Sequence, residues 1–205
     1  MSVAWVLSYL VAVCLTGCAL LRASSWHPPP EGVPTQLLFV VAGSWEGKVH
    51  LVAEPWSTYH PGSTEEERVR CALQDLLAYP AGHDEGWWFP AKRLHTMVPP
   101  KMRLLGVTLH AGRITPDFNA KIRDFRKVQN FVPGISSRAA PVTLLAQIVF
   151  TATQFSPDAA VEVLIEGKKC NLLGRSHVDI SHPWLRRDFS DAIIAEDNGG
   201  RRLFP

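Results

Sequence analysis

Two histidines and one aspartate near the C-terminal end of the chain have the side-chain types of a metal site. His177, Asp179 and His182 follow one another in the order His-x-Asp-x-x-His. Two imidazoles and a carboxylate can hold Zn²⁺ and leave a coordination position open for a hydrolytic water. The spacing matches no helical zinc motif, however, and Pro183 directly follows the last ligand candidate. We expect solvated loop side chains and no metal, so a metal-dependent hydrolase is the weakest of three functional hypotheses.

Signatures of nucleophilic and phosphate chemistry are missing from the sequence. No serine lies in a Gly-x-Ser-x-Gly turn, and no glycine-rich phosphate-binding loop is present. Cys71 falls within a predicted amphipathic helix, where a structural thiol is the usual role. The sequence therefore indicates a protein that is not an enzyme and that needs no cofactor.

One cysteine does carry a recognisable chemistry. Cys18 follows Leu15-Thr16-Gly17 at the end of an apolar run that contains no charged residue before Arg22. Leu15-Thr16-Gly17-Cys18 resembles the lipobox of bacterial lipoproteins. That resemblance implies a signal peptide over residues 1–17, cleaved before Cys18, and a lipidated Cys18 that incorporates palmitate and tethers the chain to the extracytoplasmic face of the cell membrane.

Two other interpretations of this N-terminal run stay open. The apolar stretch continues through Ala19–Leu21, which makes it long enough to span a bilayer as an uncleaved helix. No lysine or arginine precedes it, although signal peptides usually begin with a basic region. A buried element of the fold is the third interpretation.

Two cysteines remain once the signal peptide and the lipidated residue are set aside. Cys71 and Cys170 are too few for a disulfide framework. They can pair in an oxidising compartment, but we expect two isolated buried thiols.

Three consecutive aromatic residues, Trp87-Trp88-Phe89, lie in sequence typical of a loop. Aromatic faces stack on sugar rings or insert at a membrane interface, so this loop is a candidate contact for peptidoglycan or another glycan. The alternative, which we favour, is that the three rings cover one edge of the core.

Basic residues are densest at Lys121, Arg123, Arg126 and Lys127. They suit anionic lipid headgroups or wall polymers, although a solvated face is the simpler interpretation. The whole chain has 21 basic and 19 acidic residues. This balance gives no indication of a nucleic-acid partner.

The positions of proline and glycine divide the chain into segments. Residues 18–35 contain Pro28-Pro29-Pro30 and Pro34, which favour an extended spacer between the membrane and a folded domain. Residues 36–190 are of single-domain size. Residues 191–205 are predicted to form a flexible tail, because the sequence from Glu196 is polar and rich in glycine.

Within the domain, hydrophobic periodicity predicts the first elements. The unbroken apolar run Leu37–Val41 is typical of a strand covered on both faces, and Lys48–Glu54 returns as its hairpin partner. Ser63 or Thr64, followed by three glutamates, begins a helix whose apolar stripe ends at Tyr79-Pro80. That stripe consists of Val69, Ala72, Leu73, Leu76 and Leu77.

The second half of the domain repeats this alternation of elements. Residues 103–110 and 114–118 form a predicted hairpin with its turn at His110–Arg113 and with Leu105, Val107 and Leu109 on one face. Residues 119–132 are ambiguous between helix and loop. A second helix begins near Pro141 and buries one stripe as far as Phe155, and a strand covers Val161–Ile165. The order predicts an α+β fold: a two-layer sandwich in which two main helices pack on one face of a small mixed β-sheet.

Several segments resemble the GerM N-terminal-type (GerMN) domain of sporulation and spore germination. Arg70–Pro80 is similar to its first helix, Val98–Leu105 to its proline-led strand, and Val107–Phe118 to its hairpin with a late aspartate, here Asp117. Leu145–Phe155 resembles its Ala-Gln-Ile-Val-aromatic-Thr helix most closely, and Ile180–Arg186 is similar to a Pro…Arg stretch.

The resemblance spans roughly residues 36–190. The fold that it implies is similar to ring-building domains of sporulation-channel proteins. It implies protein–protein interaction or self-assembly in the cell envelope rather than catalysis. The leading hypothesis is thus a membrane-anchored, non-catalytic envelope lipoprotein. A glycan-binding module that uses Trp87-Trp88-Phe89 is the alternative.

Overall fold

The computed structural model of the protein describes residues 35–45, 48–58, 63–79, 94–125, 135–136, 139–173, 178–190 and 193–197. The predicted signal peptide, nearly all of the spacer and the Trp87-Trp88-Phe89 loop lie outside these residues. In chain order the elements are β1 (Thr35–Trp45), β2 (Lys48–Thr58), α2 (Glu65–Ala78), β3 (Leu104–His110), β4 (Arg113–Phe118), η1 (Ala120–Arg123), α3 (Ala139–Ala152), β5 (Ala160–Val161), β6 (Leu164–Ile165), β7 (Lys168–Lys169), η3 (Arg186–Phe189) and β8 (Ile193–Asp197).

The first hairpin confirms the expected doubly covered strand. β1 pairs antiparallel with β2, and the four residues Leu38–Val41 are at most 1% exposed. Successive side chains of a strand point to opposite faces. Accordingly Phe39 and Val41 belong to the main core, while Leu38 and Val40 pack with Leu76 and other residues in a smaller apolar cluster on the opposite face.

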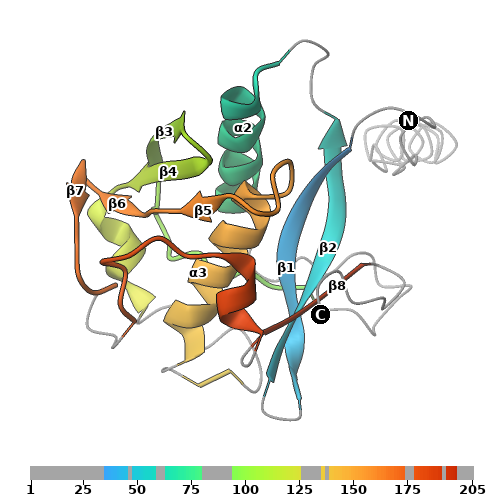
Figure 1. Cartoon of the computed structure of the whole chain (residues 1–205). Helices are drawn as coiled ribbons and strands as arrows, with labels where there is room; N and C mark the ends of the chain where they lie inside the picture. Colours follow the sequence, from blue (N-terminus) through green and yellow to red (C-terminus); the bar gives the residue numbers. More distant parts are fainter. Residues whose placement is uncertain are drawn as a thin grey trace, which may run out of the picture. The chain divides into compact units, whose positions relative to one another are not determined.

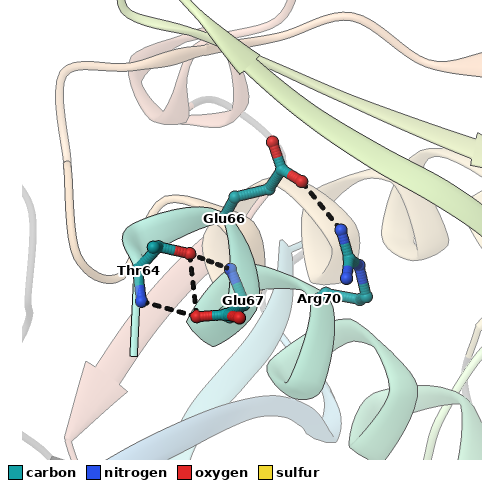
Figure 2. Close-up of polar contacts among 4 residues, drawn as sticks. All are labelled: Thr64, Glu66, Glu67 and Arg70. Carbon is teal, nitrogen blue, oxygen red and sulfur yellow. Dashed lines mark hydrogen bonds and ion pairs between the residues drawn. The ribbon is translucent and has the colours of Figure 1, made fainter. Parts of the chain in front are cut away.

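The start of α2 is fixed by a capping box (Figure 2). Thr64 Oγ1 accepts a hydrogen bond from the Glu67 backbone N–H at 3.2 Å, and the Glu67 carboxylate accepts one from the Thr64 N–H at 2.8 Å. These two bonds satisfy backbone donors that have no partner within the helix. Glu66 and Arg70 add an ion pair of 2.7 Å one turn apart. The predicted helix start is therefore confirmed, with Thr64 as its cap.

The β3–β4 hairpin turns where the sequence predicted. His110 pairs with Arg113, and both residues of the two-residue loop, Ala111 and Gly112, have positive φ. This is the type I′ arrangement, which suits the twist of paired strands. Leu105 departs from the prediction, because an irregularity between Leu104 and Gly106 shifts the register and leaves it 54% exposed.

Helix α3 is more deeply buried than expected. Pro141 lies in its first turn as predicted, but residues Ala140–Pro141 and Thr143–Ala152 are all buried. The expected single apolar stripe is therefore wrong for this helix, which occupies the middle of the domain. A helix buried all round needs partners for its polar side chains.

The strands form two sheets rather than the one small sheet that we expected. The first sheet has the order β1-β2-β8, and the second has the order β3-β4-β6-β7 with β5 also paired to β4. In Figure 1 the two helices lie between the sheets, and residues of both sheets and both helices share the main core. The α+β class and the two main helices are confirmed, but the helices contact strands of both sheets.

The ambiguous segment after β4 is resolved in part. It begins with the short 3-10 helix η1, and Ile122 and Phe125 are buried as a helical pattern required. Residues 126–134 lie outside the described residues.

The predicted flexible tail needs a correction. Residues 193–197 form β8, which pairs parallel with Val49–Ala53 of β2. Ile193, Ile194 and Ala195 are all buried, because they complete the first sheet beside the core. In the part of the chain that the structure describes, no helix is both long and apolar enough to cross a membrane.

Candidate functional site

The two described members of the His-Asp-His cluster lie near each other on the surface. His182 Nδ1 is 3.7 Å from Asp179 Oδ2, and both side chains are about half exposed. The His182 ring stacks on Trp184 with 5.0 Å between ring centroids. Hydrogen bonds from the Ser181 hydroxyl and from the Ser181 backbone N–H, the latter at 2.8 Å, lower the pKa of Asp179. His177 lies outside the described residues, among which no group of three or more metal-ligating side chains occurs.

Of the other predicted site residues, some lie among the described residues and some lie outside them. Cys18 and the three aromatic residues Trp87, Trp88 and Phe89 lie outside the described residues, as do Arg126 and Lys127. Lys121 and Arg123 are exposed on η1. The lipid-attachment site and the glycan contact therefore stay predictions.

The two thiols are free, but the expectation that they are buried is wrong. Cys71 lies on the exposed side of α2, and Cys170 is half-buried. Arg123 Nη2 donates a hydrogen bond to Cys170 Sγ at 2.9 Å. Cys71 is exposed because it lies on the polar side of the helix, although its neighbours in sequence include the buried residues Val69 and Ala72.

The polar side chains of α3 bind the backbone of β1. Gln147 Nε2 donates to the Phe39 carbonyl oxygen at 2.9 Å, and Thr151 Oγ1 accepts from the Phe39 N–H at 3.3 Å. One turn further, the Gln154 side chain accepts from the Leu37 N–H at 2.7 Å and donates to the Leu37 carbonyl oxygen at 3.0 Å. Gln147 and Thr151 lie one turn apart on one face of α3, and Gln154 follows two residues after the end of the helix. Together these side chains replace a neighbouring strand along this stretch of β1.

Gln147 connects a third segment to this arrangement. Its Oε1 accepts a hydrogen bond from the Met97 N–H at 2.8 Å, and Val41 exchanges two backbone hydrogen bonds with His95. The edge of β1 away from β2 is thus occupied by residues 95–97 and by α3. The Ala-Gln-Ile-Val-aromatic-Thr segment, on which the family resemblance depends most, builds the interior of the fold.

A cavity of about 250 Å³ opens where α3, η3 and β8 meet. η3 lies beside α3, and the chain then continues into β8 (Figure 1). Apolar side chains form most of its wall, and three basic residues and one acidic residue join them. The lining residues are Lys48, Phe150, Pro157, Asp158, Leu185, Arg186, Arg187, Ser190, Ile193, Ile194 and Ala195.

Arg186 is the most deeply buried charge of this cavity. Its Nε donates to Thr153 Oγ1 at 2.6 Å, and its Nη2 donates to the Phe150 carbonyl oxygen at 3.0 Å. That carbonyl belongs to the last turn of α3, where backbone oxygens lack helical partners and a cation suits the helix dipole. The guanidinium carbon lies 5.3 Å from the Phe150 ring centroid and 5.7 Å from that of Phe39.

Burial lowers the pKa of Arg186 to about 10, and the charge of Asp158 opposes this shift. The side chain therefore stays protonated at neutral pH. Arg187 is exposed, and Lys48 donates a hydrogen bond to the Ser190 carbonyl oxygen at 3.3 Å. With three basic side chains and one acidic side chain, the cavity is suited to an anionic group that carries an apolar neighbour.

Sequence reasoning did not identify this cavity. In the sequence, Arg186 ends a Pro…Arg stretch and Lys48 begins a predicted strand, and neither pattern indicates a cavity. Their meeting depends on the pairing of β2 with β8, which no local pattern indicated.

Comparison with known proteins identifies the family to which this fold is similar. A family model described as Germane, sporulation and spore germination, matches residues 39–170. No curated protein matches the sequence.

Solved structures give the same fold at low identity. The first GerMN domain of the sporulation protein GerM from Bacillus subtilis is 15% identical, with a TM-score of 0.51 over 76% of this chain and 99% of that chain. The tandem GerMN domains of the same protein are 15% identical with a TM-score of 0.50, over 76% of this chain and 47% of that one. The chain thus corresponds to about half of the tandem structure.

A candidate lipoprotein from Clostridium perfringens is 16% identical, with a TM-score of 0.46 over 77% of this chain and 90% of that chain. The Germane model covers more than half of the chain, including both α-helices, β3 to β7 and most of the first hairpin. The chain therefore belongs to the Germane family of sporulation and spore germination domains.

Proposed function

We propose that this protein is an extracytoplasmic lipoprotein, anchored to the membrane through Cys18, whose Germane domain acts without catalysis in protein–protein interaction or assembly in the cell envelope. The Leu15-Thr16-Gly17-Cys18 sequence supports the anchor. The family match supports a role connected with sporulation or spore germination. Anchoring and assembly are compatible, because a tethered domain meets partners held at the same surface at a raised effective concentration.

The observation that carries the proposal is the role of the polar residues of α3 and of Gln154, which lies just after the helix. Gln147, Thr151 and Gln154 donate to or accept from the backbone of β1. Because these side chains hold the strand backbone in place, the segment most typical of the family has a structural role and makes the domain rigid. A scaffold of this kind acts through its surfaces.

Metabolic labelling with radioactive palmitate tests the anchor. We expect label on the wild-type chain and none on Cys18→Ser, while Cys71→Ser keeps the label although it also removes a cysteine that is exposed in the structure. Globomycin should block maturation of the wild-type chain. An unlabelled wild-type chain would contradict the anchor.

Photo-cross-linking in cells tests the interaction role. Benzophenone side chains placed at Leu105, Leu172 and Gln74 sample exposed positions of the second sheet, of the segment after β7 and of α2. We expect a discrete protein adduct from at least one of these positions. Failure of all three positions to give a protein adduct in cells that express the full chain would count against an interaction through the second sheet, the segment after β7 or α2.

A further inference from the structure

β8 is the outer strand of the first sheet among the residues that the structure describes. It pairs with β2 on one side, and no other described strand pairs with it. The outer edge of such a strand presents backbone N–H and C=O groups to whatever lies beside it. An edge of this kind is a template for one further strand.

The cavity lies along this same edge. Three consecutive residues, Ile193, Ile194 and Ala195, line it. Because successive side chains of a strand alternate between the two faces, a cavity that touches three in a row touches the strand along its backbone. A strand added to β8 would therefore cover the mouth of the cavity.

The sequence of β8 has the chemistry that this cavity requires. It reads Ile193-Ile194-Ala195-Glu196-Asp197, an apolar segment followed by acidic residues. The cavity is apolar with a basic rim that includes Lys48 and Arg187. The apolar residues of a second β8 suit the apolar wall, and its Glu196, which lies 3.7 Å from His50 Nδ1 in its own chain, suits the basic rim at Lys48.

The register of β2 and β8 specifies how two such strands would meet. Val49 pairs with Ile193, and Lys48 precedes Val49 at the start of β2. If two β8 strands run antiparallel with Ile194 opposite Ile194, each Glu196 lies beyond the Ile193 end of the other β8, on the side of that copy's Lys48. In this register Ile193 of one copy faces Ala195 of the other on the cavity side.

We propose that a second copy of this chain docks on β8, so that two β8 strands pair antiparallel about Ile194, cover both cavities and join the two first sheets into one. This inference deepens the proposed assembly function and rests on it. The arrangement is isologous, as expected for a two-fold dimer, and it closes the open edge in both copies.

Cysteine cross-linking tests the predicted register. In full-length protein in detergent, with Cys71 and Cys170 replaced by serine, Ile194→Cys should form a disulfide-linked dimer under mild oxidation, since directly opposite Cβ atoms lie about 4.5–5.5 Å apart. Leu105→Cys, on the exposed side of β3, serves as the matched control and should stay monomeric. The absence of a dimer from Ile194→Cys, or an equal yield from Leu105→Cys, would overturn the proposal.

A charge exchange tests the predicted ion pair. Sedimentation should show that Glu196→Lys and Lys48→Glu each raise the dimer dissociation constant at least tenfold. The double exchange should restore it to within about threefold of wild type, which a general loss of folding cannot do. Lys168→Glu, an exposed charge reversal on β7, should leave the constant unchanged.

Other occupants would give other results. A cross-link from the Ile194→Cys variant to a different envelope protein, or a wild-type chain that stays monomeric at every concentration, would overturn the second-copy proposal. Palmitate labelling and adducts from the surface positions do not depend on β8. They would then show that the proposed function survives without this dimer.

Discussion

Arg186 connects three parts of the protein through one side chain. It donates to the end of α3, lies over two aromatic rings and lines the cavity beside β8. A buried guanidinium of this kind is stabilised only while its hydrogen-bond acceptors are in place. The neighbouring Arg187 has the same chemistry but is exposed.

We expect Arg186→Ala to lower the free energy of unfolding by about 2–4 kcal/mol, because it leaves the Phe150 carbonyl without this donor and opens space in the core. Arg187→Ala should change stability by less than about 0.5 kcal/mol. Urea unfolding followed by tryptophan fluorescence measures both. Similar losses from the two variants would mean that Arg186 does not have the role described above.

The aromatic loop makes a separate prediction at the residue scale. If Trp87 and Trp88 stack on glycan, the Trp87→Ala/Trp88→Ala double variant should lose retention on purified sacculi while its circular dichroism spectrum is unchanged. Equal retention of the wild-type and double-variant chains would eliminate the glycan-binding alternative.

At the scale of elements, local patterns were sufficient where a structure is set by neighbouring residues. Thr64 and Glu67 specified the start of α2, and His110–Arg113 specified the β3–β4 turn. Local patterns did not predict structure that depends on pairing with a distant segment. The three apolar residues of β8 are too few to indicate a strand until β2 lies beside them, and Leu105 moved out of its predicted face through a register shift.

The cap of α2 can be tested directly. Thr64→Ala should destabilise the protein by about 1 kcal/mol, because the Glu67 N–H loses its acceptor, while Thr64→Ser should retain most of that stability. Thermal unfolding at neutral pH measures the difference. Equal melting temperatures for wild type and Thr64→Ala would contradict the role of the cap.

The same cap should respond to acid. Hydrogen bonds from Thr64 hold the pKa of Glu67 below its ordinary value. A lowered pKa in the folded state means that the contribution is complete above the unfolded pKa and is lost as the pH falls through the folded pKa. Glu67→Gln should remove this part of the acid dependence.

Substitution of the side chains that bind α3 to β1 should lower the free energy of unfolding more than substitution at any surface position. Gln147→Leu keeps the volume approximately but leaves the Phe39 carbonyl and the Met97 N–H without the amide, so we expect a loss of about 2–4 kcal/mol. Gln74→Leu, on the exposed side of α2, is the control and should be close to neutral. A neutral result for Gln147→Leu in urea unfolding would show that the β1 edge is held by other contacts.

At the scale of the whole molecule, one core joins the two sheets. Residues of β8, α3 and β4 belong to the same cluster, among them Ile193, Leu144 and Ile114. The sequence predicted the α+β class and both helices, because each has a strong periodic pattern. It could not predict the division into two sheets, which depends on α3 being buried on all sides.

Ile193→Ala should therefore affect the distant second sheet. We expect a loss of about 2–4 kcal/mol, and the amide protons of Ile114 and Phe118 in β4 should exchange faster by the corresponding factor. Leu105→Ala, on the exposed side of β3, should leave these amide protons protected. Exchange in β4 that does not respond to Ile193→Ala would mean that the sheets unfold independently.

The parallel pairing of β2 with β8 has a consequence for biogenesis. The two strands are separated by most of the chain, so β2 keeps one open edge until the C-terminal segment has been synthesised. Contacts this distant in sequence close late and slowly during folding. An interrupted or proteolysed chain that lacks residues 193–197 would thus leave β2 exposed to pairing with other chains, so synthesis of these five residues protects the first sheet against aggregation.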